Sequence, residues 1–401
     1  MPTALDIDLM NLDAFEAGTE PDLFARLRDA DPLHWNDEPG DGPGFWSVTR
    51  YDDVLAVANN HAAFTVRGGT QIPSRRAEGN GAPSIHHVDP PDHGPLRRLA
   101  AQHIRPVKVK ALEGDVLAVV DELLDRQLGA GPFDLVREIS AQLPLVMIGR
   151  LLGAPLADCP HLLRWTNQMA SEDPDYSQGP QTAARARDEV FGYFRALEAQ
   201  RRACPADDLV SALVAADLDG VPLSRGHLDA YYLILMVAGN ETTRNLLSGG
   251  TLALDRNPRW WDAIREQPAR TRLLVEEMVR WVSPVLSMRR TATRDVPMHG
   301  RTIRAGEKVV MWFNSANRDP RAFERADEFV GDRHPNPHLG FGFGEHACIG
   351  ANLARLEAKL FFARVAERDL SLRVVREPRL LRSNFFHGIK ELTVELGPRH
   401  G

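Results

Sequence analysis

The sequence predicts a mainly α-helical protein with small β-sheets, an α+β fold in which helices form most of the core. The run 227–256 is unusually apolar, and a helix that is apolar all round belongs in the core of a large protein. Residues 20–29 and 272–281 carry apolar side chains three and four positions apart, which is typical of helices with one buried face. Segments 44–50 and 287–295 contain β-branched or aromatic residues, or alternate in polarity, and predict strands.

The N-terminal part is expected to alternate between helix and strand. Pro21 lies near the first turn of helix 20–29, a position that proline favours. Strand 44–50 leads into a short helix, 51–60, whose two final asparagines tolerate the conformation of a helix end. Residues 67–83 then change to Gly, Ser, Pro and Arg without periodicity. Long irregular loops in compact proteins are usually functional or disordered, so we interpret this one as a candidate lid.

The rest of the chain is helical in pattern until its last third. The polar stretch 173–182 is interpreted either as a second lid segment or as a plain surface connection. Gly300 and Gly306 mark the turns of a small hairpin, and segments 370–375 and 391–396 predict short strands. We find no low-complexity linker, so we expect one domain over residues 1–401.

Composition excludes several classes of function. The 401 residues are 43% hydrophobic and 26% charged, which is typical of a globular protein. A net charge of −7 without a basic stripe argues against nucleic-acid binding. The cysteines Cys159, Cys204 and Cys348 are too few for a disulfide framework and favour a reducing compartment. Because we find neither a signal-peptide pattern nor a membrane-spanning apolar run, we expect a cytoplasmic protein without a membrane anchor.

One cysteine lies in a glycine-rich segment. Cys348 follows Gly342 and Gly344 and precedes Gly350 and a helical pattern that begins at Ala351. Glycine permits close approaches that a β-carbon forbids, and the positive end of the helix dipole is expected to lower the pKa of the thiol toward a metal-binding thiolate. An isolated cysteine is more often a small buried hydrophobe, but a thiolate in a glycine loop suits haem iron.

The apolar helix 227–256 is interrupted by polar residues. Gly239, Glu241, Thr242 and Thr243 lie where burial is expected, and helix interiors disfavour such groups unless something compensates for them. A purely structural explanation is available, because threonine can bond its own helix carbonyls and glycine can permit close packing. A functional site in the middle of the helix is the alternative.

The segment 341–350, with the sequence Phe-Gly-Phe-Gly-Glu-His-Ala-Cys-Ile-Gly, resembles the haem-binding signature of the cytochrome P450 family. The resemblance implies a single-domain P450 fold that holds haem b between the long helix and the cysteine loop. It also implies that Cys348 is the axial ligand of the iron, that Phe341 shields its sulfur, that His346 reaches a haem propionate, and that Gly350 ends the cofactor-binding motif. An axial thiolate favours cleavage of the O–O bond.

Two further segments are similar to propionate-binding elements of that family. In residues 89–97, His93 and Arg97 lie four positions apart on one helical face and match the family's histidine and arginine. Arg290, five residues before Asp295, resembles the third propionate ligand. Arginine presents a planar fork that matches a carboxylate.

The polar part of the long helix is similar to the family element that lies over the iron. The resemblance assigns Ala238 and Gly239 to the haem-facing groove, Thr242 to the hydroxyl beside dioxygen, and Glu241 to its acid partner.

The family also contains a Glu-x-x-Arg element that has a structural role. Glu277 and Arg280 match this element, and either Arg333 or Arg318 is expected to complete it. The residues that follow are expected to line the substrate pocket, namely Val285, Leu286 and Met288.

The resemblance implies a monomeric monooxygenase that hydroxylates an apolar small molecule, of the steroid, terpenoid or lipid type, with O2 and two electrons. The chain shows neither a dinucleotide-binding glycine motif nor a four-cysteine cluster, so electrons are expected from a ferredoxin and its reductase. An acidic ferredoxin is expected to dock on basic residues near the cysteine loop, namely Arg105, Lys108, Lys110, Arg355 and Lys359.

Two alternatives stay open. One is a tailoring oxidase of the same family that acts on a polyketide or another natural product. The other belongs to a different class: a peroxide-using or non-oxygenating haem-thiolate protein, or a haem-based ligand sensor.

Overall fold

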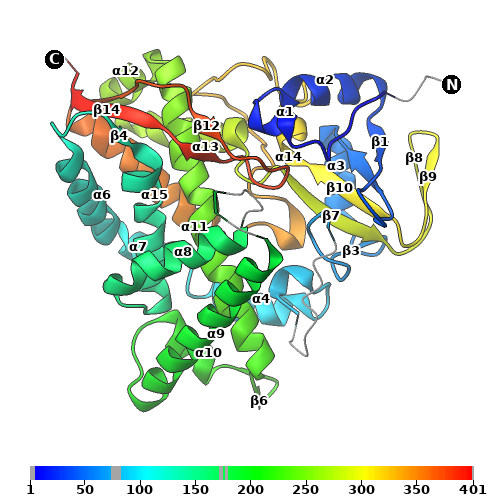
Figure 1. Ribbon diagram of the computed structural model, residues 1–401, viewed down its shortest axis with the longest axis horizontal. Helices are drawn as coiled ribbons and strands as arrows, with labels where there is room; N and C mark the ends of the chain where they lie inside the picture. The colour runs from blue at the N-terminus through cyan, green and yellow to red at the C-terminus, as the bar shows by residue number, and fades with distance from the viewer. Residues whose placement is uncertain (1–4, 74–82, 171–174, 177–178, 400–401) are drawn as a thin grey trace.

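The computed structural model describes residues 5–73, 83–170, 175–176 and 179–399, and helices form most of it (Figure 1). The α-helices are α1 (Asp13–Glu16), α2 (Glu20–Ala30), α3 (Tyr51–Asn59), α4 (His93–Ala101), α5 (Pro106–Ala111), α6 (Glu113–Gln127), α7 (Gln142–Leu152), α8 (Cys159–Ala170), α9 (Pro180–Ala203), α10 (Leu209–Ala215), α11 (Arg225–Arg256), α12 (Arg259–Glu266), α13 (Thr271–Val282), α14 (Phe313–Ala316) and α15 (Ala351–Glu367). Among the described residues, no helix combines the length and the apolar character that a membrane crossing requires.

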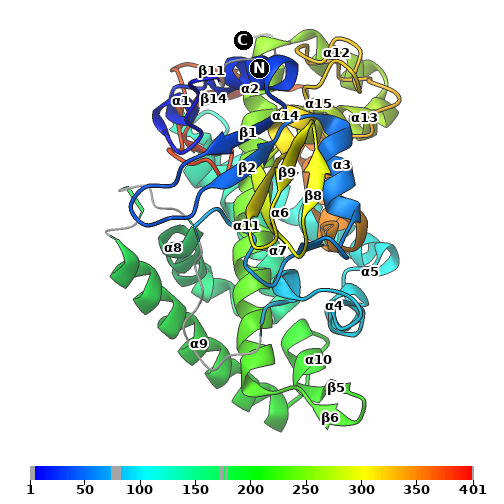
Figure 2. The same cartoon turned by 90° about the vertical axis from the view of Figure 1, so that its right-hand side faces the viewer.

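The strands form small sheets at the margins of the helical body (Figure 2). They are β1 (Leu33–Asn36), β2 (Phe45–Val48), β3 (Phe64–Thr65), β4 (Phe133–Asp134), β5 (Asp217–Leu218), β6 (Val221–Pro222), β7 (Ser287–Ala292), β8 (Val296–Met298), β9 (Arg301–Ile303), β10 (Lys308–Trp312), β11 (Leu370–Val374), β12 (Arg379–Leu380), β13 (Ile389–Glu391) and β14 (Thr393–Pro398). The prediction of a mainly helical protein with small sheets is confirmed.

The largest sheet has the order β1-β2-β10-β7-β3. Its central strand, β10, runs parallel to β2 and antiparallel to β7, where Val309 lies opposite Arg290. All five residues of β10 are buried, which is typical of a central strand. This pairing fixes the position of Arg290 along the sheet. At the other end of the molecule, β14 pairs with β11 and β4.

Helix α11 passes through the body of the protein and contacts α7, α8, α9, α13 and α15 (Figure 1). Close packing needs glycine at several of its positions. A β-carbon at Gly250 would lie 2.9 Å from the Met278 sulfur, and one at Gly239 would lie 2.9 Å from Cδ1 of Ile148 on α7. Gly239 therefore permits close packing of α11 against α7, and this structural explanation does not depend on any functional role of the residue.

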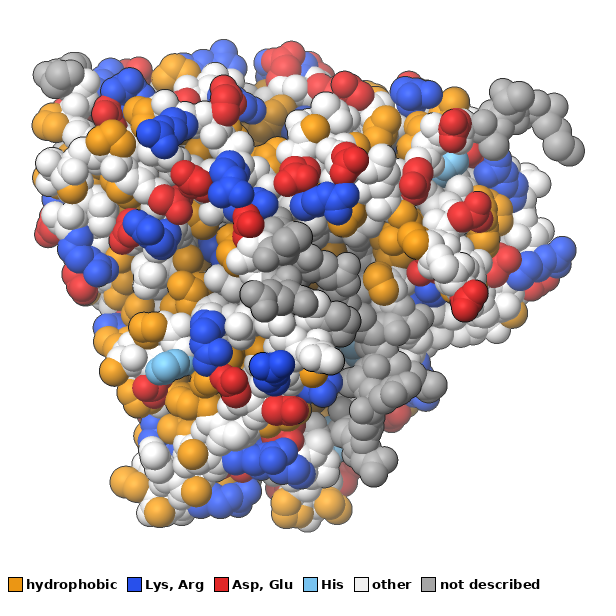
Figure 3. Space-filling view, in the orientation of Figure 1, with side chains coloured by type: hydrophobic (Ala, Val, Ile, Leu, Met, Phe, Trp, Pro, Cys, Tyr) orange, Lys and Arg blue, Asp and Glu red, His pale blue; other side chains and the backbone are white. Residues whose placement is uncertain are grey.

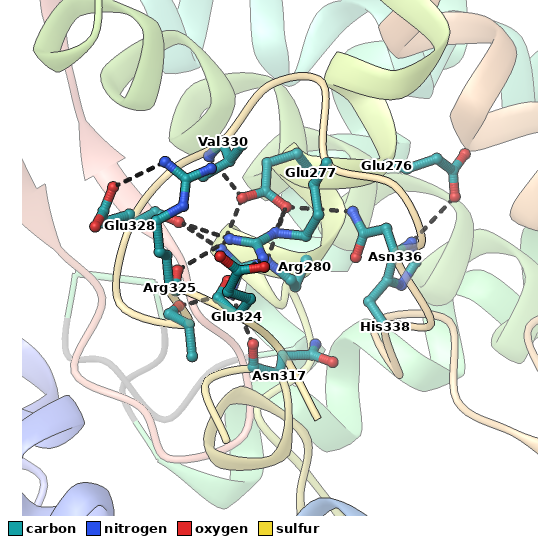
Figure 4. Close-up of polar contacts among 12 residues, drawn as sticks. Glu276, Glu277, Arg280, Asn317, Glu324, Arg325, Glu328, Val330, Asn336 and His338 are labelled. Carbon is teal, nitrogen blue, oxygen red and sulfur yellow. Dashed lines mark hydrogen bonds and ion pairs between the residues drawn. The ribbon is translucent and has the colours of Figure 1, made fainter. Parts of the chain in front are cut away.

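A buried ion-pair cluster joins α13 to the irregular segment that follows α14 (Figure 4). Arg280 donates to both carboxylate oxygens of Glu277, at 2.8 and 2.7 Å, and to the carbonyl oxygens of Asn317 and Ala326. The residue that completes the cluster is Arg333, whose Nε donates to Glu277 at 3.0 Å. Arg318, the other candidate, lies elsewhere: its guanidinium stacks 3.8 Å from the centre of the Trp281 ring.

Replacing Glu277 with alanine is expected to lower the free energy of unfolding by about 3–5 kcal/mol, because it leaves two buried guanidiniums without their carboxylate. Urea unfolding of the haem-loaded protein measures the loss. The matched control is Glu395→Ala, since Glu395 pairs with Arg373 on the surface, with both side chains at least 40% exposed. That variant should lose at most about 1 kcal/mol. Equal losses in the two variants would contradict a structural role for the cluster.

Candidate active site

A cavity of about 1660 Å³ lies in the interior of the protein and reaches the loop that holds Cys348. The site residues that the sequence predicts in its wall come from four parts of the chain: α4, α11, β7 and the cysteine loop. Ten of the eleven predicted site residues line it, namely His93, Arg97, Ala238, Gly239, Thr242, Arg290, Phe341, His346, Cys348 and Gly350. The exception is Glu241, which is buried but is absent from the cavity wall.

The cysteine loop is closed by its own backbone. The Cys348 N–H donates to the Phe341 carbonyl oxygen at 2.7 Å. Gly342 and Gly344 have φ of 68° and 69°, in the left-handed region where a side chain would cost energy. Gly350 caps α15, so the sulfur lies at the start of that helix and is open to the cavity. The glycine-dependent loop that the sequence predicts directly before the helix at Ala351 is therefore present.

The predicted lowering of the thiol pKa, however, is wrong for the protein chain alone. Burial raises the pKa of the Cys348 thiol and outweighs the Gly350 N–H group and the Arg97 guanidinium, which lower it. The helix end acts in the predicted direction, but the cost of removing a charged thiolate from water is larger. Coordination to a metal cation deprotonates a thiol outright, so a bound cation would offset this cost.

Cationic and hydrogen-bonding groups gather beside the thiol. The rings of His93 and His346 lie 4.2 Å apart, centre to centre, and Arg97 donates to the Ala347 carbonyl oxygen. Burial lowers the pKa of Arg290 to about 10, whereas Asp89 acts to raise it. Burial and the charge of Arg290 lower the pKa of His346 to about 3.

These groups fit the carboxylates of a haem. The His346 Nε2 atom is buried and has no hydrogen-bond partner among the described residues. Burial also lowers the pKa values of His93 and Arg97, so it works against every positive charge of the cluster. Two carboxylates placed here would compensate for that burial and use the free ring nitrogen. A thiolate ligand with carboxylate-binding groups at one side matches the donor set that haem b requires.

Thr242 and Glu241 lie on different faces of α11. The Thr242 hydroxyl donates to the Ala238 carbonyl oxygen at 2.9 Å and faces the cavity. The Glu241 carboxylate, 1% exposed, accepts a hydrogen bond from Arg244. Arg244 in turn donates to Asn167 on α8 at 2.7 Å. Glu241 is therefore held behind the cavity wall, and its action as the acid partner of Thr242 stays a prediction.

Sequence reasoning missed several polar residues of the cavity wall, among them His86, His87 and Glu357. His86 and His87 have ring centres 3.9 Å apart and lie close to the predicted cationic cluster, and burial lowers the pKa of both. Glu357, on α15, is buried, and burial raises its pKa to about 8. The available signals were two adjacent histidines just before residues 89–97 and one carboxylate on an otherwise apolar helix face.

The predicted apolar lining is present in part. Val285 and Met288 line the cavity, but Leu286 points into a core cluster with Phe45 and Trp312, because neighbouring residues of an extended chain face opposite sides. Parts of both predicted lid segments, residues 74–82, 173–174 and 177–178, lie outside the described residues.

A thiol that opens from a glycine loop into the cavity, carboxylate-binding groups beside it and an apolar helix above them define a haem-thiolate protein. A family model described as "Cytochrome P450" matches residues 181–368. The linalool 8-monooxygenase of Pseudomonas putida is 35% identical in sequence to this chain, and the match covers 98% of this chain and 99% of the relative's length. The steroid C26-monooxygenase of Rhodococcus jostii is also 35% identical, and the match covers 94% of this chain and 84% of the relative's length. A Mycobacterium marinum cytochrome P450 in complex with pseudoionone has a TM-score of 0.90 at 32% identity, covering 98% of both chains.

The chain belongs to the cytochrome P450 family. It is a haem b monooxygenase, an oxidoreductase that transfers oxygen from O2 to its substrate.

Proposed function

We propose that this P450, acting as one domain over residues 1–401, hydroxylates an apolar molecule of the steroid, terpenoid or lipid type with electrons from a ferredoxin. The observation that carries the proposal is the cavity wall away from Cys348, where α7, α11 and the segments after α13 present aliphatic and aromatic side chains. These include Ile148, Leu151, Leu233, Ile234, Val237, Leu246, Val285, Met288 and Phe386. Apolar walls bind a substrate by removing its apolar surface from water, and they do so without hydrogen bonds to polar groups of the substrate.

Each predicted site residue has a role in this proposal. Cys348 would supply the thiolate ligand of the iron and Phe341 would shield it, while His93, Arg97, Arg290 and His346 would hold the two propionates. The bound haem supplies the chemistry of O2 activation. Ala238 and Gly239 form the part of the cavity wall opposite the cysteine loop. The Thr242 hydroxyl, with Glu241 behind it, delivers protons to a site from which the apolar wall excludes water.

A basic surface near the cysteine loop supports a ferredoxin partner. Helix α5 contacts α15 and exposes Lys108 and Lys110, Arg105 is exposed directly before α5, and α15 exposes Lys359. Val107, 74% exposed, lies among these charges. An apolar side chain surrounded by lysines and arginines suits an acidic partner. By contrast, the face shown in Figure 3 intersperses basic and acidic side chains, without the continuous basic area that nucleic acid requires.

Removing a propionate partner is expected to loosen the haem. A buried carboxylate that loses its cation costs several kcal/mol, so Arg97→Ala and Arg290→Ala should purify with little haem. The ratio of haem to protein absorbance measures occupancy. Arg289→Ala is the matched control, because Arg289 neighbours Arg290 on β7 but is absent from the cavity wall. Full occupancy in both test variants would contradict the proposed clamp.

The substrate class is tested by titrating the haem-loaded protein with steroids, terpenoids, fatty acids and macrolides while following the haem absorption spectrum. We expect steroids or terpenoids to bind most tightly and to yield hydroxylated product with O2, NAD(P)H, a ferredoxin and its reductase. Tight binding of macrolides alone would favour a polyketide-tailoring oxidase. Product formed with peroxide but not with the ferredoxin pair, or binding without NAD(P)H consumption, would contradict the proposal.

A further inference from the structure

Arg355 is held in one position on the side of the cysteine loop away from the substrate. It lies on α15, seven residues after Cys348. Its Nε and Nη2 atoms donate to the two carboxylate oxygens of Glu276, on α13, at 2.7 and 2.9 Å. Its guanidinium carbon lies 4.3 Å from the centre of the Phe341 ring. A two-pronged ion pair combined with stacking fixes both the position and the plane of the guanidinium. Arg355, which the sequence analysis expected to help dock a ferredoxin, is therefore also paired within the protein, and its docking role stays a prediction.

Glu276 is itself fixed by a histidine of the cysteine loop. The His338 Nε2 atom lies 3.0 Å from the second Glu276 oxygen, as Figure 4 shows, and the Gly340 N–H donates to His338 Nδ1 at 3.3 Å. Because Nδ1 accepts, the proton of a neutral ring is on Nε2 and points at the carboxylate. Burial alone would raise the pKa of Glu276, but the hydrogen bonds from His338 and Arg355 lower it to about 2. Glu276 is thus ionised at neutral pH.

The stacked ring belongs to the residue that binds the backbone of the cysteine. The Phe341 carbonyl accepts from the Cys348 N–H, so a shift of Phe341 moves the ligand as well. Because its guanidinium stacks on the Phe341 ring, Arg355 holds a positive charge beside the loop that carries the sulfur. A positive charge that stabilises a thiolate in a water-poor site also favours adding an electron to the metal that the thiolate binds.

We propose that Arg355, clamped by Glu276 and His338, is a positioning residue that fixes the Phe341 ring beside Cys348 and sets the reduction potential of the haem. The inference rests on haem binding at Cys348. It makes two predictions of opposite sign. Arg355→Gln removes a positive charge and leaves the Glu276 charge unpaired, so the haem becomes harder to reduce. Glu276→Gln leaves the Arg355 charge uncompensated, so the haem becomes easier to reduce.

Potentiometric titration of the haem-loaded variants, followed by absorbance, tests the proposal. At a fixed potential, the ratio of reduced to oxidised haem should fall several-fold in Arg355→Gln and rise in Glu276→Gln. Arg355→Lys keeps the charge and should restore most of the potential. The matched control is Arg364→Gln, because Arg364 lies on the same helix and makes an equivalent two-pronged pair with Asp121, at 2.8 and 3.0 Å. It should leave the potential unchanged.

Several outcomes would overturn the inference. Potentials that move in the same direction in Arg355→Gln and Glu276→Gln would indicate general disruption of the loop. An equal shift in Arg364→Gln would indicate that any surface charge suffices. An unchanged potential in Arg355→Gln, with a raised KM for ferredoxin, would return Arg355 to a docking role. A parent protein that bound no haem would instead contradict the assignment of Cys348, so the two failures are distinguishable.

Discussion

Reduced Cys348→Ala protein is expected to lose the absorption band that carbon monoxide gives with thiolate-bound haem. Cys348 presents its sulfur to the cavity from the glycine loop, and alanine offers no donor atom in its place. Cys348→His should also abolish the band, because a neutral imidazole does not push electron density onto the iron as a thiolate does. A difference spectrum of the purified, reduced variants measures the effect.

The two other cysteines provide matched controls. Cys159 is buried against Gly149, where its sulfur would lie 3.7 Å from an added β-carbon, and Cys204 is exposed at the end of α9. Neither lines the cavity. Cys159→Ser and Cys204→Ser should therefore keep the full band, although Cys159→Ser buries a hydroxyl and should lose some stability. A band that survived in Cys348→Ala would show that the thiolate comes from elsewhere.

The elements with strong periodicity could be predicted from the sequence, and the central strand could not. Helices α13 and α15 lie where the spacing of their apolar residues predicts them, and α11 lies where a long run that is apolar all round predicts a core helix. Strand β10 contains the continuous apolar run 309–312, which carries no period that separates strand from helix. Its partners, β2 and β7, are set by contacts between distant segments, which local sequence does not encode.

The site residues show the same division. Motifs with fixed spacing on one helix or one loop, such as His93 with Arg97, place their side chains together because local geometry decides the outcome. The role of Arg355 could not be predicted, since Glu276 lies 79 positions away in the sequence. The choice of Arg333 over Arg318 depends in the same way on how an irregular segment folds back onto α13.

Helix spacing alone could not decide the position of Glu241. Adjacent helix positions point roughly 100° apart, but this cavity is wide enough that the adjacent residues Ala238 and Gly239 both line it. The structure places the hydroxyl in the wall and the carboxylate against Arg244. Any exchange of protons between them therefore needs an intervening water or a movement of the carboxylate.

Replacing Thr242 with alanine is expected to separate oxygen consumption from product formation. The variant should still bind substrate and accept electrons, because neither step needs the hydroxyl. Proton delivery is what should change. The alanine leaves space for a water molecule in the wall of the cavity, and unguided protonation should divert most of the reduced oxygen to hydrogen peroxide. NAD(P)H consumption should continue while product falls, and Glu241→Gln should instead slow consumption, because it removes the acid behind the relay.

Thr251→Ala is the matched control for this measurement. Thr251 lies on the same helix and makes the same hydrogen bond, from its hydroxyl to the Leu247 carbonyl oxygen at 2.9 Å, but it is buried away from the cavity. NAD(P)H, product and peroxide should be measured together with a surrogate ferredoxin pair. If loss of a helix hydrogen bond were enough to disturb coupling, both threonine variants would release peroxide. If Thr242→Ala alone does so, the hydroxyl acts through its place in the cavity wall, and unchanged coupling in that variant would place proton delivery at another residue.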